Sequence, residues 1–107
     1  ALSKLLEQPA DMDMKIRFVT KDGVKIELIS FAKPKVESTG QRRKMNQGGL
    51  SHIAFAVDDI DATLAAIKAN GGKVADETMF APPGAGKYVF ATDPDGNRLE
   101  ITAPAKK

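Results

Sequence analysis

Cysteine and tryptophan are absent from this sequence of 107 residues, which has a single histidine, His52. Without cysteine the chain has no disulfide framework, no thiolate metal site and no cysteine nucleophile. Long apolar runs are also missing: no stretch approaches the ~20 residues that a membrane-spanning helix needs, and no signal-peptide pattern opens the chain. These absences predict a soluble globular protein without a membrane partner, and they are compatible with a cytoplasmic location.

A strong charge of one sign is missing as well. The formal net charge is +2, and the basic residues are scattered apart from Arg42-Arg43-Lys44 and the terminal Lys106-Lys107. A nucleic-acid partner would need a denser basic face, usually with stacking aromatic residues, and the chain has only five Phe and one Tyr. No nucleic-acid partner is therefore expected. The length suits a single domain, residues 1–107.

The first half of the chain predicts a short helix, a hairpin and a loop. Residues 1–8 carry leucines at helical spacing and end at Pro9, like the last turns of a longer helix. Strands are expected at 15–20 and 24–31, around the turn Lys21-Asp22-Gly23. Residues 34–49 are polar and contain three glycines, which predicts a linker loop.

The second half predicts the order strand, helix, strand, strand, strand. The strand 50–57 leads to Asp58-Asp59, which should cap a helix over 60–69 that stops at Gly71. Short strands are expected at 73–74, 88–92 and 98–102, the last two joined by a turn at Asp93-Pro94-Asp95-Gly96. The segments GVKIELISF and GNRLEITAP share Gly, two residues, an apolar residue, Glu and another apolar residue, which indicates an imperfect internal repeat.

Strand alternation places the one histidine on the same kind of face as two glutamates. Side chains point to opposite faces in turn, so one face should meet the helix and the other should carry His52, Glu27 and Glu100. The residues expected toward the helix are Ile53, Phe55, Val57, Leu99 and Ile101. If the polar faces curve to a common centre, one imidazole and two carboxylates form a suitable ligand set for a divalent ion. The alternative is a half-buried histidine in a strand with two solvated glutamates.

Two further motifs have plainer explanations. Residues 80–88, FAPPGAGKY, lack the spacing of a phosphate loop and predict a rim loop in which Lys87 could contact an anionic substrate. Asp58, Asp59 and Asp61 lack the spacing of a calcium loop and are expected to cap the helix.

Two segments of the second half carry a family resemblance: GGLSHIAFAVDDIDATLAAIKANGGKV and KYVFATDPDGNRLEI. Together they resemble the vicinal oxygen chelate superfamily, which includes glyoxalase, fosfomycin-resistance, bleomycin-resistance and extradiol dioxygenase proteins. The resemblance implies an α+β fold of paired βαβββ modules that form a curved mixed sheet around a metal site. It implies a second module at 50–105, a partial first module at 1–33 and a linker between them. The family's fourth ligand, often His or Gln, lies on the first strand of the first module, and that strand has no counterpart before Ala1.

The resemblance also implies residue roles. His52, Glu100 and Glu27 match metal ligands, for Zn, Ni, Co, Mn or Fe, and Glu27 and Glu100 are the catalytic candidates. A small-molecule substrate is expected, with isomerase or lyase chemistry through a metal-chelated enediolate or oxyanion. The missing strand would leave a sheet edge that a second copy could cover. Together with the pairing of modules between chains in many members of the superfamily, this edge implies a homodimer. The alternatives are a metal-free binding protein of the bleomycin-resistance type and a pure dimerisation scaffold.

Overall fold

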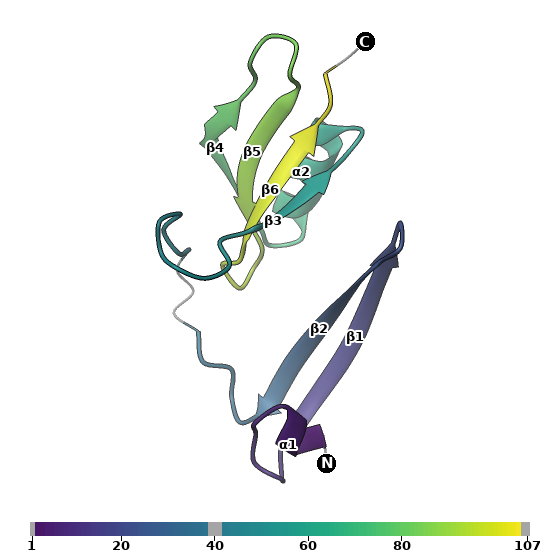
Figure 1. Ribbon diagram of the computed structural model, residues 1–107, viewed down its shortest axis with the longest axis vertical. Coiled ribbons are helices and arrows are strands. Elements are labelled where there is room, and N and C mark those ends of the chain that lie inside the picture. Colours follow the sequence, from purple (N-terminus) through teal and green to yellow (C-terminus); the bar gives the residue numbers. More distant parts are fainter. Residues whose placement is uncertain (1, 39–41, 106–107) are drawn as a thin grey trace. The chain divides into compact units, whose positions relative to one another are not determined.

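The computed structural model describes residues 2–38 and 42–105, which fall into two compact units, residues 1–38 and 39–107 (Figure 1). The elements are α1 (Leu2–Leu5), β1 (Asp13–Lys21), β2 (Val24–Lys33), β3 (Ile53–Ala56), α2 (Ile60–Ala69), β4 (Lys73–Phe80), β5 (Lys87–Thr92) and β6 (Arg98–Ala103). Within the described ranges, no helix is long and apolar enough to cross a membrane. The grouping of both units into one domain remains a prediction.

The first unit is an antiparallel hairpin preceded by one short helix. β1 and β2 pair from Lys21 and Val24 at the turn to Asp13 and Lys33 at the far end. Asp22 and Gly23 form the turn with φ of 52° and 78°, the left-handed conformation that matches the twist of a two-residue hairpin. The predicted hairpin is confirmed, whereas the helix expected over 1–8 is limited to Leu2–Leu5, and Ala1 lies outside the described residues.

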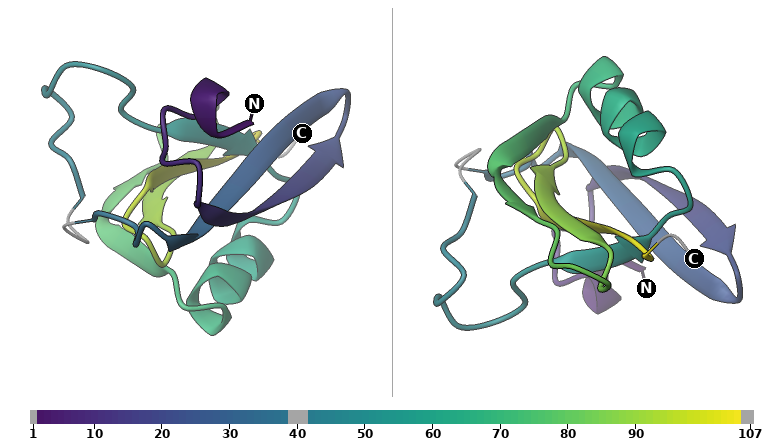
Figure 2. Two further views of the ribbon diagram at one scale, coloured as in Figure 1. Left: turned by 90° about the horizontal axis from the view of Figure 1, so that it is seen from below. Right: turned by 90° about the horizontal axis from the view of Figure 1, so that it is seen from above.

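The second unit is a complete βαβββ module. Its four strands follow the order β3-β6-β5-β4, and β3 pairs with β6 in parallel while the other neighbours are antiparallel. Figure 2 shows α2 against one face of this sheet, which leaves the opposite face clear of the helix. The predicted α+β fold with a mixed sheet is confirmed.

The helix α2 has the predicted bounds because local contacts set both ends. The Asp59 carboxylate accepts a hydrogen bond from the Ala62 amide at 3.0 Å, which satisfies one of the free amides of the first turn. At the other end, Asn70 caps the helix and Gly71 follows with φ of 87°, where glycine is favoured. The helix therefore presents Ile60 and Leu64, its two buried residues, to the sheet.

The core lies between α2 and the three strands β4, β5 and β6. Its buried members are Ile60, Leu64, Val89, Ala91 and Ile101. The prediction for Ile101 is confirmed, and Leu99 and Val57 pack against the core from partly buried positions. The prediction that Ile53 and Phe55 face the helix was wrong, since both side chains are exposed. The reason is topological: β3 is at the edge of the sheet, and α2 contacts β4, β5 and β6 only.

Two strands have different bounds from those expected. The strand predicted over 50–57 is limited to Ile53–Ala56, because its partner β6 begins at Arg98 and pairs Leu99 with Ile53. β4 extends from Lys73 to Phe80, well beyond the expected 73–74. Its ladder with β5 breaks after Ala75, and the Thr78 hydroxyl accepts a hydrogen bond from the Phe90 amide at 2.9 Å. This bulge lets the strand continue to the pair Phe80–Tyr88.

Two glycines in the loop between β4 and β5 offer a matched test of backbone strain. Gly84 and Gly86 have φ of 76° and 90°, but a Cβ on Gly84 meets open space, whereas a Cβ on Gly86 collides with the Ala103 carbonyl oxygen. We expect Gly84→Ala to lower the free energy of unfolding by about 1 kcal/mol, from the left-handed backbone alone. Gly86→Ala should cost about 2 kcal/mol more, because β5 and β6 must separate to admit the methyl group. Urea denaturation of both variants measures the difference, and equal losses would contradict the collision.

Candidate functional site

The structure brings His52 and Glu100 together on the sheet face opposite α2. The His52 Nε2 atom lies 3.0 Å from the Glu100 Oε2 atom, and the two side chains are 23% and 25% exposed. His52 directly precedes β3 and Glu100 lies within β6, the strand that pairs in parallel with β3. The pairing of two segments distant in the chain therefore creates the contact.

Two neighbours fix the orientation of the His52 ring. The Ser51 hydroxyl lies 2.8 Å from Nδ1, and the Phe90 ring packs edge-on at a centroid distance of 5.3 Å. If Nδ1 donates its proton to Ser51, Nε2 is left with a lone pair directed at the Glu100 carboxylate, which also has only acceptors. If Ser51 donates to Nδ1, the Nε2 proton is free to hydrogen-bond Glu100. The tautomer without a proton on Nε2 favours a cation between Nε2 and the Glu100 carboxylate. The tautomer with a proton on Nε2 needs no cation, because the two groups can hydrogen-bond directly.

Strand register arranges the side chains of this face in three consecutive rows across β4, β5 and β6. We call them the cationic row (Lys73, Thr92, Arg98), the carboxylate row (Ala75, Phe90, Glu100) and the aromatic row (Phe80, Tyr88, Thr102). Neighbouring rows are two residues apart along β5 and β6, a step of about 7 Å, whereas the bulge in β4 puts Phe80 five positions after Ala75. The carboxylate row, with His52 beside it, therefore lies between a charged row and an apolar row.

A groove of about 270 Å³ lies at the aromatic end of the face. Its lining includes Phe80 and Tyr88, whose ring centroids are 6.2 Å apart, together with Phe90 and Glu100. An apolar group placed in this groove would lie beside the Glu100 carboxylate. The face can thus bind a small molecule whose polar atoms are at the carboxylate row.

At the other end, Arg98 is a buried cation. It is 8% exposed, its Nη2 donates a hydrogen bond to the Arg43 carbonyl oxygen at 2.6 Å, and its guanidinium lies over the Phe90 ring at 5.2 Å. Among the described residues, its Nε and Nη1 have no hydrogen-bond partner. Burial lowers the pKa of the Arg98 guanidinium, and the positive charge of Arg42 lowers it further. A positive charge is therefore held next to the His52–Glu100 pair.

Glu27, the third expected ligand, belongs to the other compact unit. It is an exposed residue of β2, paired with Phe18 of β1. Within residues 2–38 and 42–105, no group of three or more His, Cys, Asp or Glu side chains is arranged to hold a metal ion. The structure thus groups two of the three expected ligands, and the role of Glu27 stays a prediction.

The donor chemistry of His52 and Glu100 nevertheless fits a divalent ion. An imidazole nitrogen and a carboxylate oxygen are common ligands of Zn²⁺ and similar ions, which they bind at about 2.1 Å. Two ligand atoms at that distance lie about 3.0 Å apart at the 90° angle of an octahedral ion and about 3.4 Å apart at the tetrahedral angle. The observed 3.0 Å is close to the octahedral value. The pair can therefore supply two neighbouring ligands of one ion.

The sequence reasoning missed the cationic row and Phe90. Each strand shows its own alternation, but only the register between strands reveals that Lys73, Thr92 and Arg98 form one row beside Glu100. The sequence contained one indication of this arrangement. Arg98 precedes Glu100 by two residues within β6, so the two side chains lie on the same face of the sheet.

Comparisons with known proteins agree with this architecture. The family model described as Glyoxalase/Bleomycin resistance protein/Dioxygenase superfamily matches residues 2–101. The chain belongs to this superfamily. A solved structure, that of a glyoxalase family protein from Bacillus cereus, superposes with a TM-score of 0.79 and 19% identity, over 98% of this chain and 70% of that one. At that identity, the likeness concerns the fold alone.

Curated members of the superfamily match part of the chain. A lactoylglutathione lyase of Haemophilus influenzae is 45% identical over 50 residues, which are 47% of this chain and 37% of that protein. A probable lactoylglutathione lyase of Vibrio parahaemolyticus is 48% identical over 50 residues, covering 47% and 36%. The uncharacterized protein YaeR of Escherichia coli is 39% identical over 77 residues, covering 71% and 55%. The matched segments thus span little more than a third of the two lyases.

Proposed function

We propose that the chain is part of a metal-dependent enzyme of the glyoxalase type, an isomerase or lyase acting on a small molecule with two neighbouring oxygens. The observation that carries the proposal is the His52–Glu100 pair, with its donor atoms 3.0 Å apart on a sheet face free of the helix. Membership of the superfamily and the similarity to lactoylglutathione lyases support it.

In this proposal, His52, Glu100 and Glu27 hold a divalent ion (Zn, Ni, Co, Mn or Fe). When bound, the ion would act as a Lewis acid that polarises oxygens of the substrate. Ser51 and Phe90 hold the imidazole ring in place, so that Nε2 rather than Nδ1 faces Glu100. A carboxylate oxygen of Glu27 or Glu100 would move the proton next to the substrate oxygens as a general base.

One observation favours a second function, a metal-free binding protein of the bleomycin-resistance type. With Nε2 protonated, His52 can donate directly to Glu100 at the observed 3.0 Å, and the pair is satisfied without an ion. The face would then bind its ligand through the groove at the aromatic row. The two functions differ in whether metal is needed for any chemistry.

We also propose that the protein acts as a homodimer. The hairpin leaves large apolar side chains of both strands exposed, namely Phe18, Val19, Val24, Leu28 and Ile29. The pairing register places Val19, Val24 and Leu28 on one face of the hairpin and Phe18 and Ile29 on the other, so apolar surface is exposed on both faces. A second copy would remove it from water, and sedimentation of the purified chain measures whether it does.

The function is tested with lactoylglutathione, the compound named in the relatives. If the chain moves a proton beside two neighbouring oxygens, protein loaded with a divalent ion should exchange the C2 hydrogen of the lactoyl group for deuterium in D₂O. Proton NMR measures the loss of the C2 hydrogen signal. This measurement does not depend on which side the equilibrium of the overall reaction favours. We expect exchange with at least one of Ni²⁺, Zn²⁺, Co²⁺, Mn²⁺ or Fe²⁺, and none after treatment with a chelator. Metal-independent binding without exchange would support the binding protein instead.

A further inference from the structure

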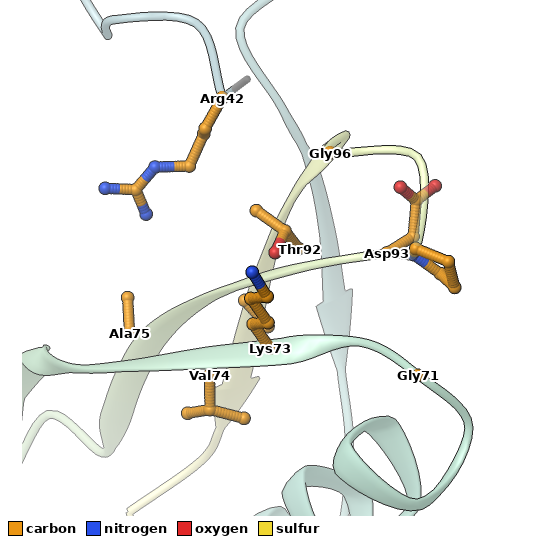
Figure 3. Close-up of a pocket in the computed structure, with 10 residues that line it drawn as sticks. Arg42, Gly71, Lys73, Val74, Ala75, Thr92, Asp93 and Gly96 are labelled. Carbon is orange, nitrogen blue, oxygen red and sulfur yellow. The ribbon is translucent and has the colours of Figure 1, made fainter. Parts of the chain in front are cut away.

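A second pocket, of about 370 Å³, lies over the cationic row. Figure 3 shows Arg42, from the loop before β3, and Lys73, from β4, projecting into this space, with Thr92 of β5 beside Lys73. Ala75, two residues beyond Lys73 in β4, also contributes to the lining. Two cationic side chains and a hydroxyl group therefore face one cavity.

In the described part of the chain, the lining of this pocket has two positive charges, on Arg42 and Lys73, and one negative charge, on Asp93. Neither Arg42 nor Lys73 takes part in an ion pair there; the pairs found join Lys33 with Asp11 and His52 with Glu100. Asp93 also lines the pocket, but both of its carboxylate oxygens already accept hydrogen bonds within the β5–β6 turn, from the amides of Asp95 and Asn97 and from the Asn97 side chain.

Arg98 adds to this charge and positions the loop. Arg98 is 8% exposed, its Nε and Nη1 have no hydrogen-bond partner among the described residues, and its Nη2 donates a hydrogen bond to the Arg43 carbonyl oxygen. Arg42 is next to Arg43 in the chain, so this hydrogen bond fixes the backbone from which Arg42 enters the pocket. A buried cation without a carboxylate partner is costly, and an anion in the adjacent pocket would lower that cost.

We propose that this pocket binds the anionic group of the substrate, a carboxylate or a phosphate, and so defines the substrate class. The inference rests on the proposed function, because it places the two neighbouring oxygens at His52 and Glu100. The cationic row is one two-residue step from the carboxylate row, which sets the anion about 7 Å from those oxygens. Arg42 and Lys73 contact the anion, Thr92 donates a hydroxyl hydrogen bond to it, and the groove at the aromatic row takes the apolar part of the molecule.

The experiment compares two ligands of similar size and shape, one with a charged carboxylate and one with a neutral amide. Both 3,4-dihydroxybenzoate and 3,4-dihydroxybenzamide carry neighbouring oxygens on an aromatic ring, but only the first is anionic. Calorimetric titration of the Zn²⁺-loaded protein should show the benzoate binding about fivefold more tightly, the gain expected from exposed charges. The difference should disappear in the double variant Arg42→Gln/Lys73→Gln and remain in Lys68→Gln, which removes a charge from α2 on the other side of the sheet.

A titration with inorganic phosphate separates this pocket from the metal site. Phosphate should shift the amide NMR signals of Lys73 and Thr92 in the wild type and equally in His52→Ala, but not in the double variant. Absence of these shifts, or a benzoate preference that survives in the double variant, would overturn the anion pocket. Phosphate shifts together with no binding of either dihydroxy ligand would overturn the metal-site proposal and leave the anion pocket standing.

Discussion

Replacing His52 with alanine should lower the affinity for divalent ions by about 100-fold or more. Removal of a residue that merely supports a metal ligand costs about 10- to 100-fold in affinity, and removal of a ligand costs at least as much. His52 is the only histidine of the chain, so no other imidazole can replace its nitrogen atom. The fold should survive the change, because His52 lies outside the buried core.

Glu100→Gln provides the companion variant, because it keeps the shape of the side chain and removes its charge. Glutamine is a weaker ligand than carboxylate, so metal affinity should again fall, and the proton exchange of lactoylglutathione should fall with it. Glu77→Gln is the matched control, since Glu77 is an exposed carboxylate of the same sheet. Metal titration by calorimetry measures all three variants. Equal affinity in the wild type and His52→Ala would favour the metal-free binding protein.

A large loss of stability, about 3 kcal/mol in the free energy of unfolding, is expected for Ile101→Ala. Ile101 is 2% exposed and packs in the small cluster that joins α2 to the sheet. Alanine would leave a cavity there, and the cluster has few other residues to close it. Since domains are stable by only about 5–15 kcal/mol, the variant should unfold at a markedly lower urea concentration.

Ile53→Ala is the control for this substitution. It makes the same change in β3, the strand beside β6, but Ile53 is 54% exposed and outside the core. We expect a loss below about 1 kcal/mol, because little apolar area returns to water. Urea denaturation followed by the amide signals of β5 reports on the second unit directly. Similar losses for both variants would contradict the position of the core between α2 and β4, β5 and β6.

The parts of the fold that short-range contacts determine could be predicted from the sequence. Both ends of α2 follow from the residues beside them, Asp59 with its hydrogen bond to Ala62 and Gly71 with its positive φ. The hairpin turn at Asp22-Gly23 is equally local. The contact of His52 with Glu100 followed from alternation in two strands, given the family resemblance that placed those strands side by side.

The remaining features depend on partners distant in the chain. The length of β4 rests on the hydrogen bond between the Phe90 amide and the Thr78 hydroxyl, and the start of β3 rests on where β6 begins. Exposure of Ile53 reflects the place of β3 at the sheet edge, which alternation cannot reveal. Alternation within one strand cannot reveal the cationic row either, because its three residues become neighbours only when β4, β5 and β6 pair in register.

The place of β3 at the sheet edge also affects the dynamics of the site. β3 has four residues, all exposed, and it pairs with β6 alone. Short strands with few buried contacts open locally at a lower free energy than the core does. Detachment of β3 would carry His52 away from Glu100 while Val89, Ala91 and Ile101 stay packed. An ion bound by both side chains would link the two strands, so its binding and the free energy of this local opening would be thermodynamically coupled.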